Sequence, residues 1–205
     1  SGSDVTHLGL FDIPLISNIP NMVYLAPTTK EEHLAMVDWA IEQDKHPVAI
    51  RVPNMEVVST GAAVEANFDE LNKYVMVEEG KDVAIIGLGS FFHLGKKVQE
   101  RLRNTGINAT LINPRFITGV DEDLLNELKE NHKVVITLED GILDGGFGEK
   151  ISRFYGNSQM RVLNFGATKE FTDSVELDVL YERYHLTEEL IVEDIEKVLA
   201  DIKVF

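Results

Sequence analysis

The sequence predicts an α/β protein built on an open, mostly parallel β-sheet that helices cover on both faces. Short runs of buried-type apolar residues alternate with amphipathic segments of helical period, an order typical of parallel strands joined by helical crossovers. The run Asp82–Gly87 is typical of a strand that is buried on both sides. No apolar run approaches 18 residues, so no membrane-spanning helix is expected.

Residues 1–53 are expected to contain one strand–helix–strand unit. The strand runs are Met22–Ala26 and Pro47–Val52, and Pro27 and Pro53 mark their ends. Two such strands joined by one helix are expected to pair in parallel.

The helix between these strands has a recognisable start. Thr28 or Thr29 is the expected N-cap, and two glutamates stand three residues further on, as a capping box requires. Leu34, Val37 and Ile41 then recur at helical spacing, which predicts one apolar face.

Residues 54–80 show no clear period and are predicted to be a linker that carries one edge strand, Tyr74–Glu78. Residues 81–205 are expected to form a second α/β unit. Its predicted strands are Asp82–Gly87, Ala109–Asn113, Lys133–Leu138 and Arg161–Asn164. Its predicted helices are one that ends near Asn104 before the capping Gly106, then Asp121–Asn131, Glu149–Tyr155 and Thr187–Ile202.

Composition excludes several classes of function. The net charge of −16 means that nucleic acid and anionic membrane surfaces repel the chain, so neither is an expected partner. The absence of cysteine excludes disulfides and thiolate chemistry, and we expect a cytoplasmic location.

Two polar residues are candidates for chemistry. His7 begins a glycine-containing loop and has a side chain that moves protons near neutral pH; by chemistry alone, a surface or hydrogen-bonded histidine is the commoner case. Arg51 stands at the end of a predicted strand, at the edge where α/β sheets bind ligands, and its guanidinium suits phosphate or carboxylate. The alternative for Arg51 is a structural ion pair.

Two glycine-rich segments were considered as ligand sites. Gly87–Gly95 follows a strand and opens a helix, but its glycine spacing does not match a dinucleotide-binding loop, so close strand–helix packing is favoured. Gly141–Gly148, with Glu139, Asp140 and Asp144, offers oxygen ligands for a cation. A tight turn into a helix start is the favoured interpretation there. The remaining histidines show no zinc-site spacing and stand at positions 33, 46, 93, 132 and 185.

Five motifs in order resemble the transketolase superfamily. T-H-x-G-x-F-D at 6–12, I-P-N-M-x-Y-L-A-P-T at 19–28 and A-I-R-V-P at 49–53 are similar to the end of its pyrimidine-binding domain. A-T-L-I-N-P-R-F-I-T-G-V-D at 109–121 and L-E-D-G-I-L-D-G-G-F-G at 138–148 are similar to its C-terminal domain. The first motif is most like that of the 1-deoxy-D-xylulose-5-phosphate synthases. The resemblance thus implies the end of a pyrimidine-binding domain in 1–53 and a transketolase C-terminal domain in 81–205.

The resemblance also implies a chemistry. Such synthases use thiamine diphosphate and Mg²⁺ to decarboxylate pyruvate and add the two-carbon unit to glyceraldehyde 3-phosphate, and the cofactor supplies the carbanion chemistry. It implies that His7 faces the thiazolium and substrate as a catalytic residue, and that Arg51 holds the acceptor's phosphate. Homodimers are expected.

The chain departs from the family pattern in two ways. The synthases carry Asp-Gly-x-Thr-His, whereas Ser3 and Asp4 stand here in place of that Asp and Gly; these two are the remaining candidate substrate-binding residues, and another acceptor is the alternative. The family's metal-binding motif and its cofactor-activating glutamate lie upstream of the matched part. We therefore expect this chain to bind no cofactor or metal and to be inactive alone.

Two other functions stay open. The chain could be one component of a two-subunit transketolase-like enzyme or of a 2-oxo-acid dehydrogenase decarboxylase. It could also be a non-catalytic interaction domain, with the glycine-rich turn and the last helix as its binding surface. An exposed apolar surface is expected where other domains of an intact enzyme pack.

Overall fold

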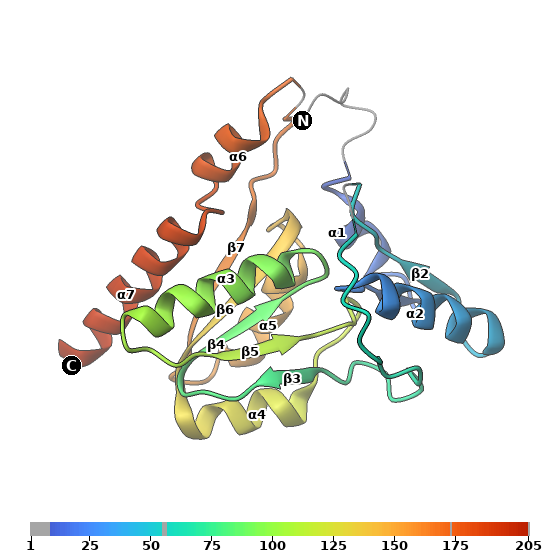
Figure 1. Cartoon of the computed structure of the whole chain (residues 1–205), viewed down its shortest axis with the longest axis horizontal. Helices are drawn as coiled ribbons and strands as arrows, with labels where there is room; N and C mark the ends of the chain where they lie inside the picture. Colours follow the sequence, from blue (N-terminus) through green and yellow to red (C-terminus); the bar gives the residue numbers. More distant parts are fainter. Residues whose placement is uncertain (1–8, 55–56, 173, 205) are drawn as a thin grey trace.

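The computed structural model describes residues 9–54, 57–172 and 174–204, which form the predicted α/β architecture (Figure 1). No helix in these ranges is long and apolar enough to cross a membrane. The elements in chain order are α1 (Asp12–Ile16), β1 (Val23–Leu25), α2 (Lys30–Glu42), β2 (Val48–Ile50), β3 (Val75–Glu78), β4 (Asp82–Gly87), α3 (Phe91–Asn104), β5 (Thr110–Asn113), α4 (Glu122–Asn131), β6 (His132–Ile142), α5 (Phe147–Tyr155), β7 (Arg161–Ala167), α6 (Leu177–Arg183) and α7 (Glu188–Val204).

A five-stranded sheet forms the larger unit. Its strand order is β3-β5-β4-β6-β7, and every neighbouring pair is parallel except β3 with β5. This confirms the prediction of a mostly parallel open sheet. The predicted edge strand Tyr74–Glu78 is confirmed as well, because β3 lies at the end of the strand order and, among the described strands, pairs with β5 alone.

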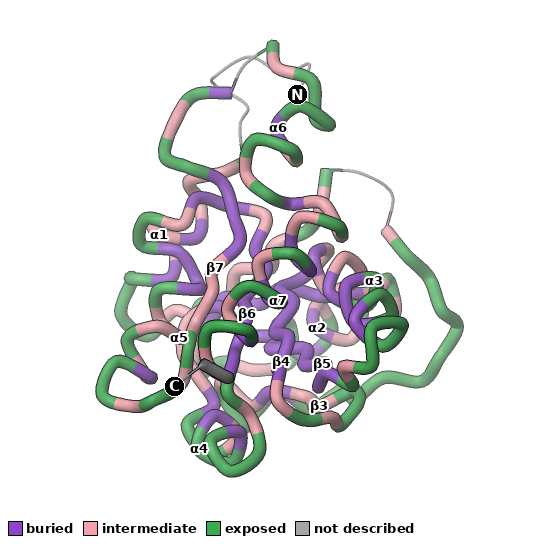
Figure 2. Tube along the Cα trace, turned by 90° about the vertical axis from the view of Figure 1, so that its left-hand side faces the viewer, coloured by how far each residue is buried: buried purple, intermediate pink, exposed green. Residues whose placement is uncertain are grey.

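Helices cover both faces of this sheet. Successive side chains of a strand point to opposite faces, so Val83 and Ile85 of β4 pack with α3 and α7, whereas Ala84 and Ile86 pack with α4 and α5. Figure 2 shows the buried strands inside and the exposed outer surfaces of the helices. Burial on both sides explains why the central strand β4 is apolar from Val83 to Ile86.

The smaller, N-terminal unit is the expected strand–helix–strand motif. β1 and β2 pair in parallel, with Val23 opposite Val48, as predicted. The far side of β1 is bonded to the segment after β5, where the Ala26 N–H donates to the Arg115 carbonyl at 2.8 Å and the Ile117 N–H to the Tyr24 carbonyl at 2.7 Å. The unit is therefore joined to the larger unit by main-chain hydrogen bonds.

The apolar face predicted for α2 is not the buried one. Leu34 and Ile41 are 53% and 77% exposed, whereas Glu32, Met36 and Trp39 are buried. The prediction was wrong because helical spacing identified a set of apolar residues without showing which face meets the strands. Thr29 does cap the helix, since its hydroxyl accepts from the Glu32 N–H at 3.2 Å.

Three other elements differ from the prediction. The helices α1 and α6 were not predicted, because one has 5 residues and the other 7, too few to display a period. Strand β6 runs past its expected end at Leu138 to Ile142, and so into the turn expected at Gly141–Gly148. This extension places Glu139 and Asp140 on a strand.

Candidate functional site

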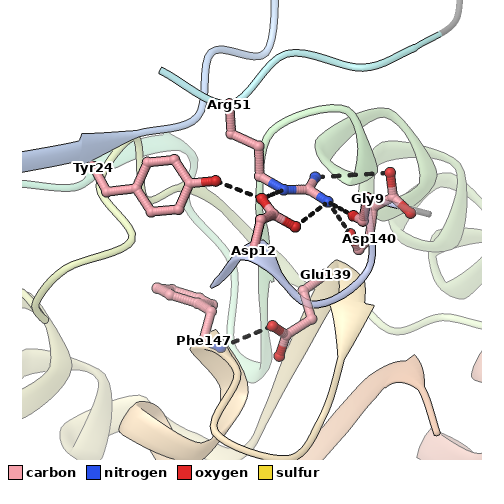
Figure 3. A network of polar contacts seen from close by, with 7 residues as sticks. All are labelled: Gly9, Asp12, Tyr24, Arg51, Glu139, Asp140 and Phe147. Carbon is pink, nitrogen blue, oxygen red and sulfur yellow. Dashed lines mark hydrogen bonds and ion pairs between the residues drawn. The ribbon is translucent and has the colours of Figure 1, made fainter. Parts of the chain in front are cut away.

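The candidate site lies where the N-terminal unit meets the carboxyl end of β6 (Figure 3). Arg51 directly follows β2, Asp12 begins α1, and Asp140 lies near the end of β6. The carboxyl ends of parallel strands are the usual ligand-binding edge of an α/β sheet. Arg51 is thus at such an edge, as the sequence predicted.

The Arg51 guanidinium is surrounded by oxygen acceptors of its own chain. Its Nε donates to Asp12 Oδ2 at 2.7 Å, and its Nη2 donates to the Gly9 carbonyl at 2.9 Å and to the Asp140 carbonyl. Its Nη1 lies 3.7 Å from Asp140 Oδ2. The structural ion pair considered for Arg51 is therefore present, and the phosphate-binding role stays a prediction.

The electrostatics of this cluster keep Arg51 charged. Burial alone lowers the pKa of Arg51, but Asp140 and Asp12 raise it, and the pKa lies above its ordinary value. Tyr24 donates its hydroxyl to Asp12 Oδ2, and burial together with Asp12 raises the pKa of Tyr24. Tyr24 is therefore a neutral donor that helps to hold Asp12.

Glu139, next to Asp140, points away from Arg51 to the start of α5. Its carboxylate is fully buried and accepts from the Phe147 N–H at 2.7 Å and the Gly148 N–H at 2.8 Å. Burial raises the pKa of Glu139 to about 7, against the lowering effect of those two N–H donors. Glu139 thus ties the start of α5, where N–H groups lack helical partners, to β6.

The glycine-rich turn is explained by close packing. A Cβ on Gly148 would lie 2.5 Å from Thr137 Oγ1. The three acids of this segment contact different partners: Glu139 the start of α5, Asp140 the guanidinium, and Asp144 the amine of Lys169 at 3.0 Å. Within the described ranges, no group of three or more His, Asp or Glu side chains is placed to hold a metal ion.

Gly87–Gly95 is also a packing motif. A Cβ on Gly87 would lie 2.6 Å from the Phe92 Cα, and one on Gly95 would lie 3.1 Å from the Ile85 side chain. These contacts support the interpretation of close strand–helix packing over a dinucleotide-binding loop.

His7, Ser3 and Asp4 lie outside the described residues, so their predicted roles stay predictions. Asp12 and Tyr24 also belong to the Arg51 cluster, and neither was predicted as a site residue. Both stand inside the motifs that carried the family resemblance, at the end of T-H-x-G-x-F-D and within I-P-N-M-x-Y-L-A-P-T. Their place in these motifs was the sequence signal from which they could have been predicted.

Comparison with known proteins places this arrangement in a family. Residues 72–191 match the family described as transketolase, C-terminal domain. The 1-deoxy-D-xylulose-5-phosphate synthase of Clostridium tetani is 34% identical over 196 residues, which cover 95% of this chain and 31% of the synthase. The chain thus spans less than a third of the length of this curated relative.

Solved structures agree with the fold. A split gene transketolase, described as an inactive beta4 tetramer, superimposes with a TM-score of 0.78 at 27% identity and covers 96% of this chain and 63% of its own. The R356L transketolase from Pichia stipitis has a TM-score of 0.72 at 15% identity, covering 97% of this chain and 28% of its own. At that identity the likeness concerns the fold alone.

Proposed function

The chain belongs to the transketolase C-terminal domain family, and from this premise we propose that it is the C-terminal portion of a thiamine-diphosphate-dependent transferase. Its reaction is the condensation of pyruvate with glyceraldehyde 3-phosphate to 1-deoxy-D-xylulose 5-phosphate. The observation that carries the proposal is the similarity along 95% of the chain to a synthase of that name. Arg51, at the carboxyl edge of a parallel strand pair, supports it further.

The chain does not catalyse this reaction alone. The acids near the candidate site are engaged with Arg51, Lys169 and the start of α5, so the described residues do not fit a Mg²⁺–diphosphate site. The cofactor, which supplies the carbanion chemistry when bound, is held together with other parts of an intact enzyme. Pyruvate and a phosphorylated aldehyde are its substrates.

The surface of the N-terminal unit supports the need for further protein. Among the described strands, β2 pairs only with β1, which leaves its outer edge open. A parallel two-stranded sheet is marginal by itself, and an open apolar edge is usually covered. The neighbouring helix α2 exposes Leu34 and Ile41. Exposed apolar side chains beside an open strand edge suit a docking surface for further α/β structure.

Within the intact enzyme, His7 acts at the reacting centre and Arg51 binds the acceptor's phosphate, with Ser3 and Asp4 near the substrate. A planar guanidinium binds phosphate through two parallel N–H donors. In the cluster of Figure 3, Nη1 is the part of the Arg51 guanidinium proposed to make that contact, because the carboxylate oxygen that faces it, Asp140 Oδ2, lies 3.7 Å away.

The test is an assay of a full-length enzyme that contains this sequence. Pyruvate and glyceraldehyde 3-phosphate are supplied with and without thiamine diphosphate and Mg²⁺. We expect thiamine-dependent release of carbon dioxide, a large loss of turnover in His7→Ala, and a raised KM for the phosphorylated acceptor in Arg51→Ala. Lys197→Ala on the outer surface of α7 is the control. Carbon dioxide release without thiamine dependence, or none at all, excludes the proposal.

A second candidate is one subunit of a two-subunit transketolase-like enzyme. The observation that favours it is the similarity to a split gene transketolase. The two candidates differ in where the cofactor-binding residues are encoded. Activity that appears only when a separately expressed cofactor-binding chain is added would favour the two-subunit enzyme.

A further inference from the structure

We propose that Asp140 is an exchangeable counter-ion of Arg51, which an incoming phosphate group displaces while Asp12 stays bound. The inference rests on the proposed phosphate role of Arg51. It adds that the Asp140 carboxylate stands beside the guanidinium when no phosphate is bound. Two carboxylates flank one guanidinium here, and their contacts differ in kind.

Asp12 is the fixed partner. It receives a short hydrogen bond from Arg51 Nε, 2.7 Å to Oδ2, and its Oδ1 lies 3.4 Å from Nη2. The Tyr24 hydroxyl also donates to Oδ2, and the Asp12 side chain is only 26% exposed. Removing Asp12 would leave the buried donors of Arg51 and Tyr24 unpaired, which is costly.

Asp140 is the loosely held partner. Its carboxylate approaches Nη1 no closer than 3.7 Å, beyond hydrogen-bond length, and its side chain is 42% exposed. Its main-chain carbonyl separately accepts from Nη2. The Asp140 side chain can therefore turn away without breaking the link between β6 and Arg51.

The relative strengths favour exchange. The Asp140 carboxylate makes only a long, partly exposed contact with Nη1, which is a weak interaction, whereas phosphate offers charge-assisted bonds to the N–H groups there. Without a ligand, Asp140 adds a second carboxylate to the Arg51–Asp12 pair, at Nη1 of a side chain that is only 14% exposed. Partial desolvation raises the pKa of Asp140 and Arg51 opposes that rise, so losing Arg51 to phosphate raises the pKa further.

The experiment is a titration of the isotope-labelled chain with inorganic phosphate at constant ionic strength, followed by NMR. The Arg51 Nε–H and the carboxyl carbons of Asp12 and Asp140 are observed. We expect the Arg51 and Asp140 signals to move and the Asp12 signal to stay. Asp140→Asn should bind phosphate about two- to fivefold more tightly, and Arg51→Gln should lose binding. Arg51→Lys, which keeps the charge, should bind more weakly than the wild type.

Asp144→Asn is the matched control, because it removes the same charge from the same segment at a residue paired with Lys169 instead. Its phosphate affinity should equal that of the wild type. Equal affinity of Asp140→Asn and Asp144→Asn, a response at Asp12 in place of Asp140, or no phosphate binding by the folded wild type would each overturn the proposal. A thermal melt verifies that each variant is folded.

Glyceraldehyde 3-phosphate and unphosphorylated glyceraldehyde complete the test. Tighter binding of the former than of inorganic phosphate identifies a phosphorylated acceptor as the ligand, and the unphosphorylated aldehyde should leave the Asp140 signal unchanged. If Asp140 exchanges in the chain but the full-length enzyme shows no thiamine-dependent turnover, the counter-ion inference stands and the synthase proposal fails. If the full-length enzyme shows thiamine-dependent turnover but the Asp140 signal does not respond to phosphate, the synthase proposal stands and the counter-ion inference fails.

Discussion

Asn113, at the end of β5, donates its side-chain amide to the Glu32 carboxylate of α2 at 3.0 Å, and both residues are buried. The other carboxylate oxygen of Glu32 accepts from the Thr28 N–H at 2.7 Å and from the Thr28 hydroxyl at 2.9 Å. This carboxylate therefore joins the N-terminal unit to the five-stranded sheet.

Glu32→Ala should destabilise the protein. The change leaves buried donors of Asn113 and Thr28 without an acceptor, and each unpaired donor costs about 1–3 kcal/mol. Urea unfolding measures the effect. Glu42→Ala, at an exposed position of the same helix, should change stability by less than about 0.5 kcal/mol. Similar losses in both variants would contradict the bridging role of Glu32.

Glu139 should make stability depend on pH. Its pKa is raised by burial to about 7, so the folded protein binds its proton more tightly than the unfolded chain does. The contribution is present below the unfolded pKa and is lost as pH rises from about 4.5 to about 7, by on the order of 3 kcal/mol. NMR titration of the Glu139 carboxyl carbon checks the midpoint. A midpoint below pH 5 would refute the prediction.

Gly148→Ala should destabilise the start of α5. The added Cβ would lie 2.5 Å from Thr137 Oγ1 and 2.8 Å from the Asn164 side chain, and overpacking of this kind costs about 1–3 kcal/mol. Gly156→Ala, at the end of the same helix, is the control, because its Cβ would approach no atom closer than 3.4 Å. Thermal unfolding of the two variants compares them, and an unchanged Tm in Gly148→Ala would count against the close packing.

The two sides of α2 should respond differently to truncation. Met36 is fully buried, so Met36→Ala should cost about 2–5 kcal/mol. Ile41 is 77% exposed, so Ile41→Ala should leave the free energy of unfolding nearly unchanged. Urea unfolding measures the stability of both variants. A large loss of stability in Ile41→Ala would mean that the side of α2 with Ile41 is the buried one.

Much of the larger unit was predictable because its strands lie between helices on both faces. Such strands are mostly apolar, and β4 appears in the sequence as the uninterrupted run Val83–Ile86. The start of α4 was also readable, because the Asp121 side chain accepts from the Leu124 N–H of its own helix. A contact between residues only a few positions apart can be predicted from the sequence.

The candidate site was only partly predictable. Arg51 was identifiable from its place after a strand, but its partners were not. Asp12 precedes it by 39 residues and Asp140 follows it by 89. No spacing rule connects residues that far apart, because the packing of the N-terminal unit against β6 brings them together. The same reason explains the misjudged face of α2, whose inner side meets Phe68 and Phe116.

The sequence by itself determined the α/β class, the parallel pair of the smaller unit, the mostly parallel sheet of the larger unit, the family resemblance and the position of Arg51 at a strand end. These follow from apolar runs, capping residues and motifs that each lie within a few neighbouring positions. Only the tertiary structure decided which face of α2 is buried, that Asp12 holds Arg51 closely, and that Asp140 holds it loosely. Those outcomes depend on which distant segments share a surface, and free energy gained by packing the whole chain selects them.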